Sequence, residues 1–143
     1  METLLCCDQI YIQLKNGIDI KNITNELSQC IAKSNISNGF INVIVVGSTG
    51  SITTIEYEPG VVKDLKEAIN RIAPHNIVYE HEKAWHDGNG HSHVQAAIIG
   101  PSITLPVRQG KMLLGTWQQV VVINHDNKDR NRQIEITITG TTD

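Results

Sequence analysis

The chain has 143 residues with 12 basic and 15 acidic side chains, a net charge of −3, and 40% of its residues are hydrophobic. This length suits a single domain with its own core, spanning residues 1–143. The weak negative charge excludes the broad basic surface that is typical of nucleic-acid-binding proteins. No apolar run approaches the roughly 20 residues of a membrane helix, and the first residues lack a basic segment typical of secretion signals, so we expect a cytoplasmic protein without a membrane partner.

The first third of the chain predicts a strand, a helix and a second strand. Apolar and polar residues alternate from Leu4 to Leu14, which is typical of a half-buried strand. Apolar residues then recur at helical spacing from Asp19 to Lys33, with Asp19 as the expected N-cap. The β-branched run from Phe40 to Val46 predicts a strand that is buried on both faces.

The next elements are a strand and a helix. A break rich in glycine and serine at residues 47–51 precedes the strand expected at Ile52–Tyr57. The sequence Glu58-Pro59-Gly60 predicts the start of a helix, and Pro74 predicts its end.

Two runs near the C-terminus predict strands, Gln118–Asn124 and Gln133–Thr139, and the second alternates cleanly between isoleucine and polar residues. A polar loop is expected between them. Because strands and helices do not alternate strictly along the chain, the order favours the α+β class over a parallel α/β fold.

Four of the six histidines lie between positions 81 and 93, in a polar, glycine-rich segment that predicts a surface loop. If this segment is extended, His91 and His93 project from one face and can reach a single ion. His86 or Asp87 would supply a third ligand. Imidazole and carboxylate together favour zinc or a similar divalent metal over magnesium.

Two alternatives stay open for this segment. Ser92 and Gln95 fit a capping box that would open a short helix through Ile99. His93 would then occupy the first helical position, where a neutral imidazole can donate to a phosphate. The segment can also be a solvated loop without a site.

Other residues could bind an anion or transfer protons. The break at residues 47–51 has the composition of a backbone nest for an anion, with a tight turn as the alternative. Glu56, on the strand after this break, could be a general base, a metal ligand or an exposed charge. Arg130 and Arg132 could hold a phosphate, although a charged hairpin loop is the common meaning of such a pair.

Several motifs occur in a fixed order from about residue 4 to about residue 140. They are Gly-Ser-Thr-Gly-Ser-Ile-Thr-Thr-Ile-Glu-Tyr-Glu-Pro-Gly from Gly47, Asp-Gly-Asn-Gly-His-Ser-His from Asp87, Gly-Thr-Trp-Gln from Gly115, and Arg-Asn-Arg from Arg130. Together they resemble the YjbQ-like family, which is labelled secondary thiamine-phosphate synthase and is otherwise uncharacterised. The resemblance implies an α+β sandwich of mostly antiparallel strands with a few helices, and a homotrimer with sites near subunit boundaries.

The resemblance also carries over to individual residues. The matching positions are His93, which precedes a short apolar helix in the family, Asp87 and Asn89 ahead of it, Glu56 before the Glu-Pro pair, and Trp117, Gln118 and Arg132 in the C-terminal motif. Many members have His-Thr-Thr where this chain has Gly47-Ser48-Thr49. His91 or His86 is the candidate replacement for that absent imidazole.

We therefore expect an enzyme that acts on a small phosphorylated or heterocyclic substrate. The family label implies thiamine-phosphate synthase, a transferase, as a weak secondary activity. The expected catalytic residues are His93, Asp87 and Glu56; the expected substrate or anion-binding residues are Ser48, Thr49, Asn89, Trp117, Gln118 and Arg132; the expected metal ligands are His91, His93 and His86. The alternative is a non-catalytic trimer that binds a metal or an anionic metabolite.

Overall fold

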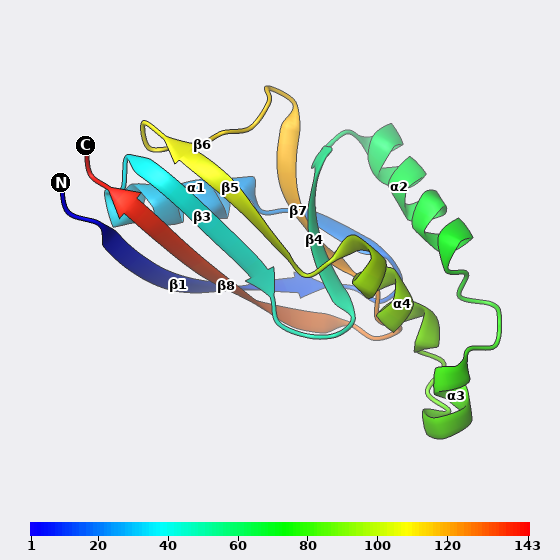
Figure 1. The fold of residues 1–143 in the computed structure, drawn as a ribbon. Coiled ribbons are helices and arrows are strands. Elements are labelled where there is room, and N and C mark those ends of the chain that lie inside the picture. Colours follow the sequence, from blue (N-terminus) through cyan, green and yellow to red (C-terminus); the bar gives the residue numbers. More distant parts are fainter.

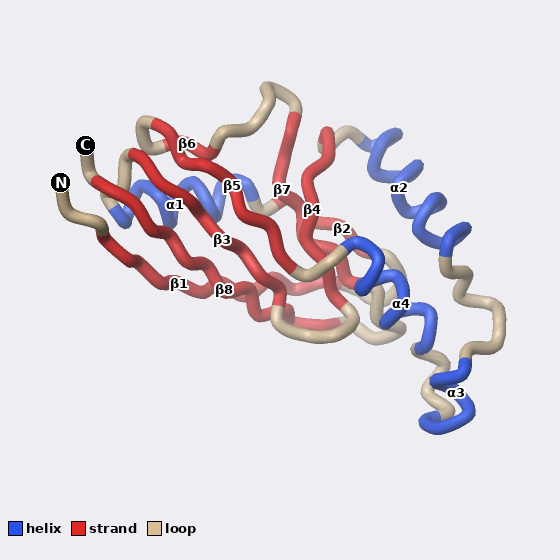
Figure 2. Tube along the Cα trace, in the orientation of Figure 1, coloured by secondary structure: helices blue, strands red, loops and turns tan.

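Two antiparallel sheets form the frame of the computed structural model, which describes every residue from Met1 to Asp143 (Figures 1 and 2). The strands are β1 (Leu4–Leu14), β2 (Asp19–Asn22), β3 (Asn38–Val45), β4 (Gly50–Glu56), β5 (Ser102–Arg108), β6 (Lys111–Met112), β7 (Gln118–Asn124) and β8 (Arg130–Thr141). The helices are α1 (Thr24–Ser34), α2 (Pro59–Ile72), α3 (Glu80–Trp85) and α4 (Gly90–Ile99). The larger sheet has the strand order β1-β8-β3-β5-β6 and the smaller one β2-β7-β4, which confirms the α+β class.

The main core lies between the two sheets and extends under α1. On β8 the side chains of Ile134, Ile136 and Ile138 are buried, as their alternation with polar residues predicts. They belong to one cluster with inward residues of β3 and β7 and with Leu27 and Ile31 of α1. Burial of each such side chain contributes about 1.5–3 kcal/mol, and a register slip of one residue would expose them all.

A second, smaller core lies on the other face of the three-stranded sheet, which α2 and α4 cover (Figure 1). Helix α2 begins as predicted, because the Glu58 carboxylate accepts hydrogen bonds from the backbone N–H groups of Gly60 and Val61. Its Ile69 packs against Val121 and Ile123 of β7. Strand β7 is therefore covered on both faces, and its end is enclosed between the main core and the helices.

The helix predicted from Asp19 starts later than expected. Residues Asp19–Asn22 form β2, which pairs with β7, and α1 begins only at Thr24. The reason is tertiary: Ile20 lies in the small core with Ile69, whereas Ile23 faces the main core. Apolar residues that share one helical spacing thus belong to two different cores. The spacing alone does not show this.

The strand predicted at Phe40–Val46 is present, but the prediction that both of its faces are buried is wrong. Phe40 is 50% exposed and Ile44 is 36% exposed. Both point to the outer face of the five-stranded sheet, and no helix or strand covers that face in Figure 1. Ile72 is also exposed, at the end of α2.

The segment predicted as a histidine-rich loop is mostly helical. Residues 80–85 form α3 and residues 90–99 form α4, so only residues 86–89 lie between helices. The expected loop between β7 and β8 is shorter than predicted because β8 already begins at Arg130. Strands β5 and β6 were not predicted. None of the four helices is long and apolar enough to cross a membrane.

Candidate functional site

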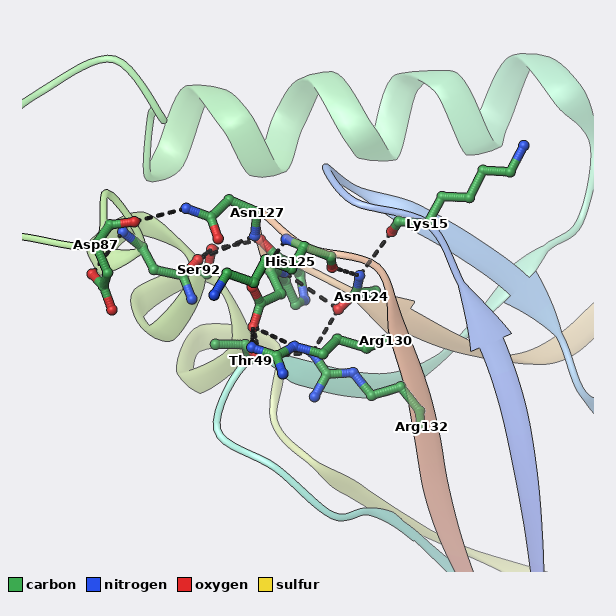
Figure 3. Close-up of polar contacts among 12 residues, drawn as sticks. Lys15, Thr49, Asp87, Ser92, Asn124, His125, Asn127, Arg130 and Arg132 are labelled. Atoms are coloured by element: carbon green, nitrogen blue, oxygen red, sulfur yellow. Dashed lines mark hydrogen bonds and ion pairs between the residues drawn. The ribbon is translucent and has the colours of Figure 1, made fainter.

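The end of β7 sends successive side chains to opposite faces of the small sheet. Val120 and Val122 face the main core, whereas Val121 and Ile123 face α2 and α4. The same alternation directs Asn124 to the inner side, where it meets Arg132, and His125 to the helical side, where it meets Gln95. Figure 3 shows the polar contacts on the inner side, where Asn124 lies between Lys15 and Arg132. Two polar clusters therefore lie back to back at this end of the sheet.

On the helical side is a cavity of about 280 Å³, which we call the histidine pocket. It is lined by Gly17, Ile18, Lys66, Asn70, His75, His91, Gln95 and His125. The turn between β1 and β2, the second half of α2, the residues after it, the first half of α4 and the end of β7 all contribute. Six of these eight residues have polar side chains, Ile18 and Gly17 being the exceptions, which suits a small polar ligand.

His125 forms the floor of the histidine pocket and is 1% exposed. Its Nδ1 lies 2.9 Å from Gln95 Oε1, and its Nε2 lies 2.7 Å from Ser51 Oγ. Because the Gln95 amide nitrogen donates to the carbonyl of Ala73, its oxygen accepts from Nδ1–H, and Nε2 then accepts from the Ser51 hydroxyl. Burial, followed by the charge of Arg132, lowers the pKa of His125 to about 4. The floor is therefore a neutral imidazole whose nitrogens are both occupied.

The other two imidazoles stand higher in the pocket. The side-chain oxygen of Asn70 accepts from the backbone N–H of His75 and lies 2.9 Å from His75 Nδ1. An oxygen at this position requires a proton on Nδ1, so the neutral ring presents the lone pair of Nε2. The ring of His91 lies 6.2 Å from that of His75, measured between centroids. Burial, followed by the nearby His75, lowers the pKa of His91.

Lys66 supplies the positive charge of the histidine pocket. It is the only lysine or arginine among the lining residues, and none of them is acidic. Lys66 and Asn70 are four residues apart on α2 and thus share one helix face. An ammonium group beside imidazoles favours an anionic ligand, which the imidazoles can serve as hydrogen-bond partners or bases.

The second cluster, on the inner side, is centred on Asp126, and we call it the Asp126 network. The Asp126 carboxylate accepts from Thr49 Oγ1 at 2.9 Å and from Arg130 Nε at 3.0 Å. Nη2 of the buried Arg132 donates to Thr49 and to Asn124. Burial raises the pKa of Asp126, but hydrogen bonds from Thr49 and Asn89 and the charge of Arg130 outweigh it and hold that pKa below its ordinary value. Most polar groups here have partners inside the protein.

Three of the predicted anion-binding residues, Thr49, Asn89 and Arg132, belong to the Asp126 network. Asn89 is the N-cap residue of α4, and its side-chain oxygen accepts from Ser92 Oγ and from the backbone N–H of Asn127. Ser48 is exposed on the turn that precedes Thr49. The prediction thus found residues that the fold brings together, but not the buried acid that joins them.

His93 and Asp87 lie outside the histidine pocket, beside His81 of α3. The rings of His81 and His93 are 4.7 Å apart, and Asp87 Oδ2 lies 3.3 Å from His81 Nε2. We call these three residues the outer histidine cluster. The catalytic role of His93 and Asp87 stays a prediction.

The expected geometry of the metal ligands is wrong. His91 and His93 are two residues apart on a helix rather than on an extended chain, so they point in different directions, His91 toward His75 and His93 toward His81. His86 is exposed at the end of α3. Ser92 is also not the N-cap, since α4 begins two residues before it. No group of three or more histidine, cysteine or acidic side chains is arranged to hold a metal ion.

Glu56, Trp117 and Gln118 lie at the opposite end of the small sheet. Glu56 pairs with Gln118, whereas Gly50 pairs with Asn124 beside the two polar clusters. Six residues of strand separate these ends, about 20 Å. Trp117 is 73% exposed, and Gln118 donates to Thr54. Within one chain these residues do not share a site with His91 or Arg132.

Sequence reasoning missed Lys66, His75, Gln95 and His125. His75 and His125 lie outside the dense histidine segment, so local counting passes over them. One signal was present: Asn-His-Asp follows the uninterrupted apolar run Val120–Ile123, and polar side chains at the end of a buried strand are a common place for a site. Lys66 and Gln95 carry no comparable signal, because both fit an ordinary helix surface.

Comparison with known proteins gives one consistent result. Residues 8–141 match the family described as UPF0047 protein YjbQ-like. A UPF0047 protein from Methanothermobacter thermautotrophicus is 31% identical over 132 residues, which cover 92% of this chain and 90% of the relative. A YbjQ-like protein of unknown function from Sulfolobus solfataricus P2 superposes with a TM-score of 0.92 at 29% identity, covering 97% of this chain and 99% of the other. A hypothetical protein from Aeropyrum pernix K1 superposes with a TM-score of 0.86 at 26% identity, covering 98% and 99%.

Proposed function

The chain belongs to the YjbQ-like UPF0047 family, and we propose that it is an enzyme that binds a small anionic, phosphorylated or heterocyclic substrate in the histidine pocket and transfers a proton there. The observation that carries this proposal is the contact between Asn70 Oδ1 and His75 Nδ1 at 2.9 Å. It presents the basic Nε2 of His75 in a cavity that also contains a lysine. This is the arrangement by which an imidazole is oriented as a general base.

The remaining lining residues supply the supporting parts. Lys66 would pair with the anionic group of the substrate, and the amides of Asn70 and Gln95 would fix its orientation. His91, whose pKa is lowered by burial, would stay neutral and serve as a second proton carrier beside His75. His125 cannot exchange protons while Ser51 and Gln95 occupy its nitrogens, so its role would be to hold the floor of the pocket in place.

We also propose that the protein forms a homotrimer, as the family resemblance implies. The uncovered face of the five-stranded sheet exposes Leu5, Tyr11, Phe40 and Ile44, and this apolar surface is available for contacts between subunits. Sedimentation equilibrium measures the mass directly. A trimer that dissociates in Phe40→Glu supports the proposal, and a monomeric wild type at micromolar concentration contradicts it.

The test of function starts from a panel of phosphorylated and heterocyclic small molecules, including the two substrates of thiamine-phosphate synthase. A compound that binds the native state raises the melting temperature by mass action. Compounds that stabilise the protein are then incubated with it, and products are identified by mass spectrometry. Conversion that is lost in His75→Ala, while the fold and melting temperature are kept, supports the proposed enzyme.

Two results of this experiment decide against the proposed enzyme. Stabilisation that depends on Lys66 but gives no product would favour the non-catalytic binding protein. Conversion that survives in His75→Ala and is lost in His93→Ala would place the chemistry in the outer histidine cluster instead. Asn76→Ala, a change at an exposed neighbour of His75, is the matched control.

A further inference from the structure

The turn between β3 and β4, residues 46–49, shows features that the histidine pocket does not explain. The backbone N–H groups of Gly47, Ser48 and Thr49 make no hydrogen bond within the protein. Ser48 is exposed, so the turn is open to solvent. Consecutive backbone N–H groups without acceptors are the feature from which anion-binding turns are built.

A buried guanidinium lies directly against this turn. Arg132 is 6% exposed, and both of its side-chain hydrogen bonds come from Nη2. Its buried Nε has no partner. Nη1 would lie 2.8 Å from a Cβ placed on Gly47. A charged group that is desolvated to this degree and keeps unused donors lacks an acceptor that an anion can provide.

Gly47 is required for this arrangement. Its φ of +137° is strained for any side chain, and a side chain there would also collide with the guanidinium. The glycine thus lets the backbone approach the positive charge closely.

The local charge balance also favours an anion. Arg130 and Arg132 share one carboxylate, that of Asp126, which is 2% exposed and paired with Arg130. One positive charge therefore remains uncompensated beside the turn. We propose that the turn and Arg132 form a binding site for a tetrahedral oxyanion, a phosphate or the phosphate group of a monoester, separate from the histidine pocket.

The test is a titration of the full-length protein with inorganic phosphate, followed by amide NMR shifts. The amides of Gly47, Ser48 and Thr49 should shift along one saturating curve. Ser48→Asp places a negative charge on the exposed turn without touching the core, and it should weaken this curve about tenfold. Ser28→Asp, at an exposed position on α1, is the matched control and should leave the curve unchanged, and so should Lys66→Ala.

The Lys66→Ala variant distinguishes phosphate binding at the turn from binding in the histidine pocket, because it removes the positive charge of the histidine pocket only. The inference is overturned if the turn amides show no saturable shift. It is also overturned if Ser48→Asp binds phosphate like the wild type. A parallel titration with phenyl phosphate identifies the source of the anion: equal curves indicate that monoesters are accepted, and a curve for inorganic phosphate alone indicates a free-phosphate site.

Discussion

The two groups of histidines in this protein differ in what surrounds their nitrogen atoms. In the histidine pocket, His125 is buried between Ser51 and Gln95, whereas His75 is exposed and is oriented by Asn70. In the outer histidine cluster, His81 is paired with the half-exposed carboxylate of Asp87, and the partly buried His93 stands beside it. The three histidines of the first group come from three separate segments, whereas the second group comes from α3, α4 and the residues between them.

This difference indicates which histidine is costly to disturb. Groups held by buried partners keep their tautomer and position, and they are costly to disturb. An exposed pair with a carboxylate is screened by solvent and contributes little to stability. The comparison therefore predicts a large loss of stability for substitutions of His125 and small losses in the outer histidine cluster.

The largest effect, a loss of unfolding free energy, is expected for His125→Ala. This change leaves the Ser51 hydroxyl and the Gln95 amide without their buried partner, and two such losses cost about 3–4 kcal/mol of unfolding free energy. Urea denaturation measures the loss. His93→Ala, the matched change in the outer cluster, should cost less than about 1 kcal/mol. Equal costs for the two variants would remove the distinction between the clusters.

A second large effect is expected from acid. The pKa of His125 is about 4 in the folded protein, against an ordinary value of 6.5. At pH values between 4 and 6.5, His125 is therefore protonated in the unfolded chain but not in the folded protein. Stability is then complete above pH 6.5 and falls as the pH drops toward 4, by about 2.5 kcal/mol at pH 4.5.

The lowered pKa of His91 acts in the same direction, whereas the lowered pKa of Asp126 matters only as the pH falls below the usual range of a carboxyl. Urea denaturation at pH 7 and pH 4.5 tests this window. His125→Gln keeps a neutral side chain and should lose much of the pH dependence. A wild type that is equally stable at both pH values would contradict the buried neutral imidazole.

An intermediate effect is expected for ligand binding. Lys66→Ala should weaken the best-stabilising compound of the panel about tenfold, because it removes the one cationic side chain of the pocket. Calorimetric titration measures the dissociation constant. Lys63→Ala, an exposed lysine on the same helix that does not line the pocket, should leave it unchanged. An equal loss in both variants would indicate a general charge effect instead of a pocket contact.

The smallest effect is expected for Asp87→Asn. The His81–Asp87 pair is 29% and 45% exposed at its side chains, so its removal should change the unfolding free energy by less than about 1 kcal/mol. Urea denaturation at neutral pH checks this value. A loss as large as that of His125→Ala would show that the outer cluster is built into the fold after all.

Much of the fold could be predicted because its strands follow local patterns. The alternation from Leu4 to Leu14 and the isoleucines of β8 predict their strands and inward faces, and Glu58-Pro59-Gly60 predicts the start of α2. Local patterns predict the wrong element where contacts with a distant segment decide the structure. Residues Asp19–Asn22 share the helical periodicity of α1, but pairing with β7 makes them a strand.

The site was harder to predict for the same reason. The sequence suggested His91, and the fold places it opposite His75, sixteen positions away, and above His125, which comes from another element. Glycine-rich composition suggested a loop at residues 81–93, but Gly90 lies within α4 because its Cα packs against Tyr79, at a spacing no larger side chain allows. Such close contacts between distant segments leave no local signature.

The most direct test of the histidine pocket is imidazole NMR of all six histidines during titration with the best-stabilising compound. The account predicts that the ring signals of His75 and His91 shift together along one binding curve, while those of His81, His86 and His93 remain in place. A curve that appears on His81 and His93, with His75 and His91 unchanged, would contradict it and move the site to the outer histidine cluster.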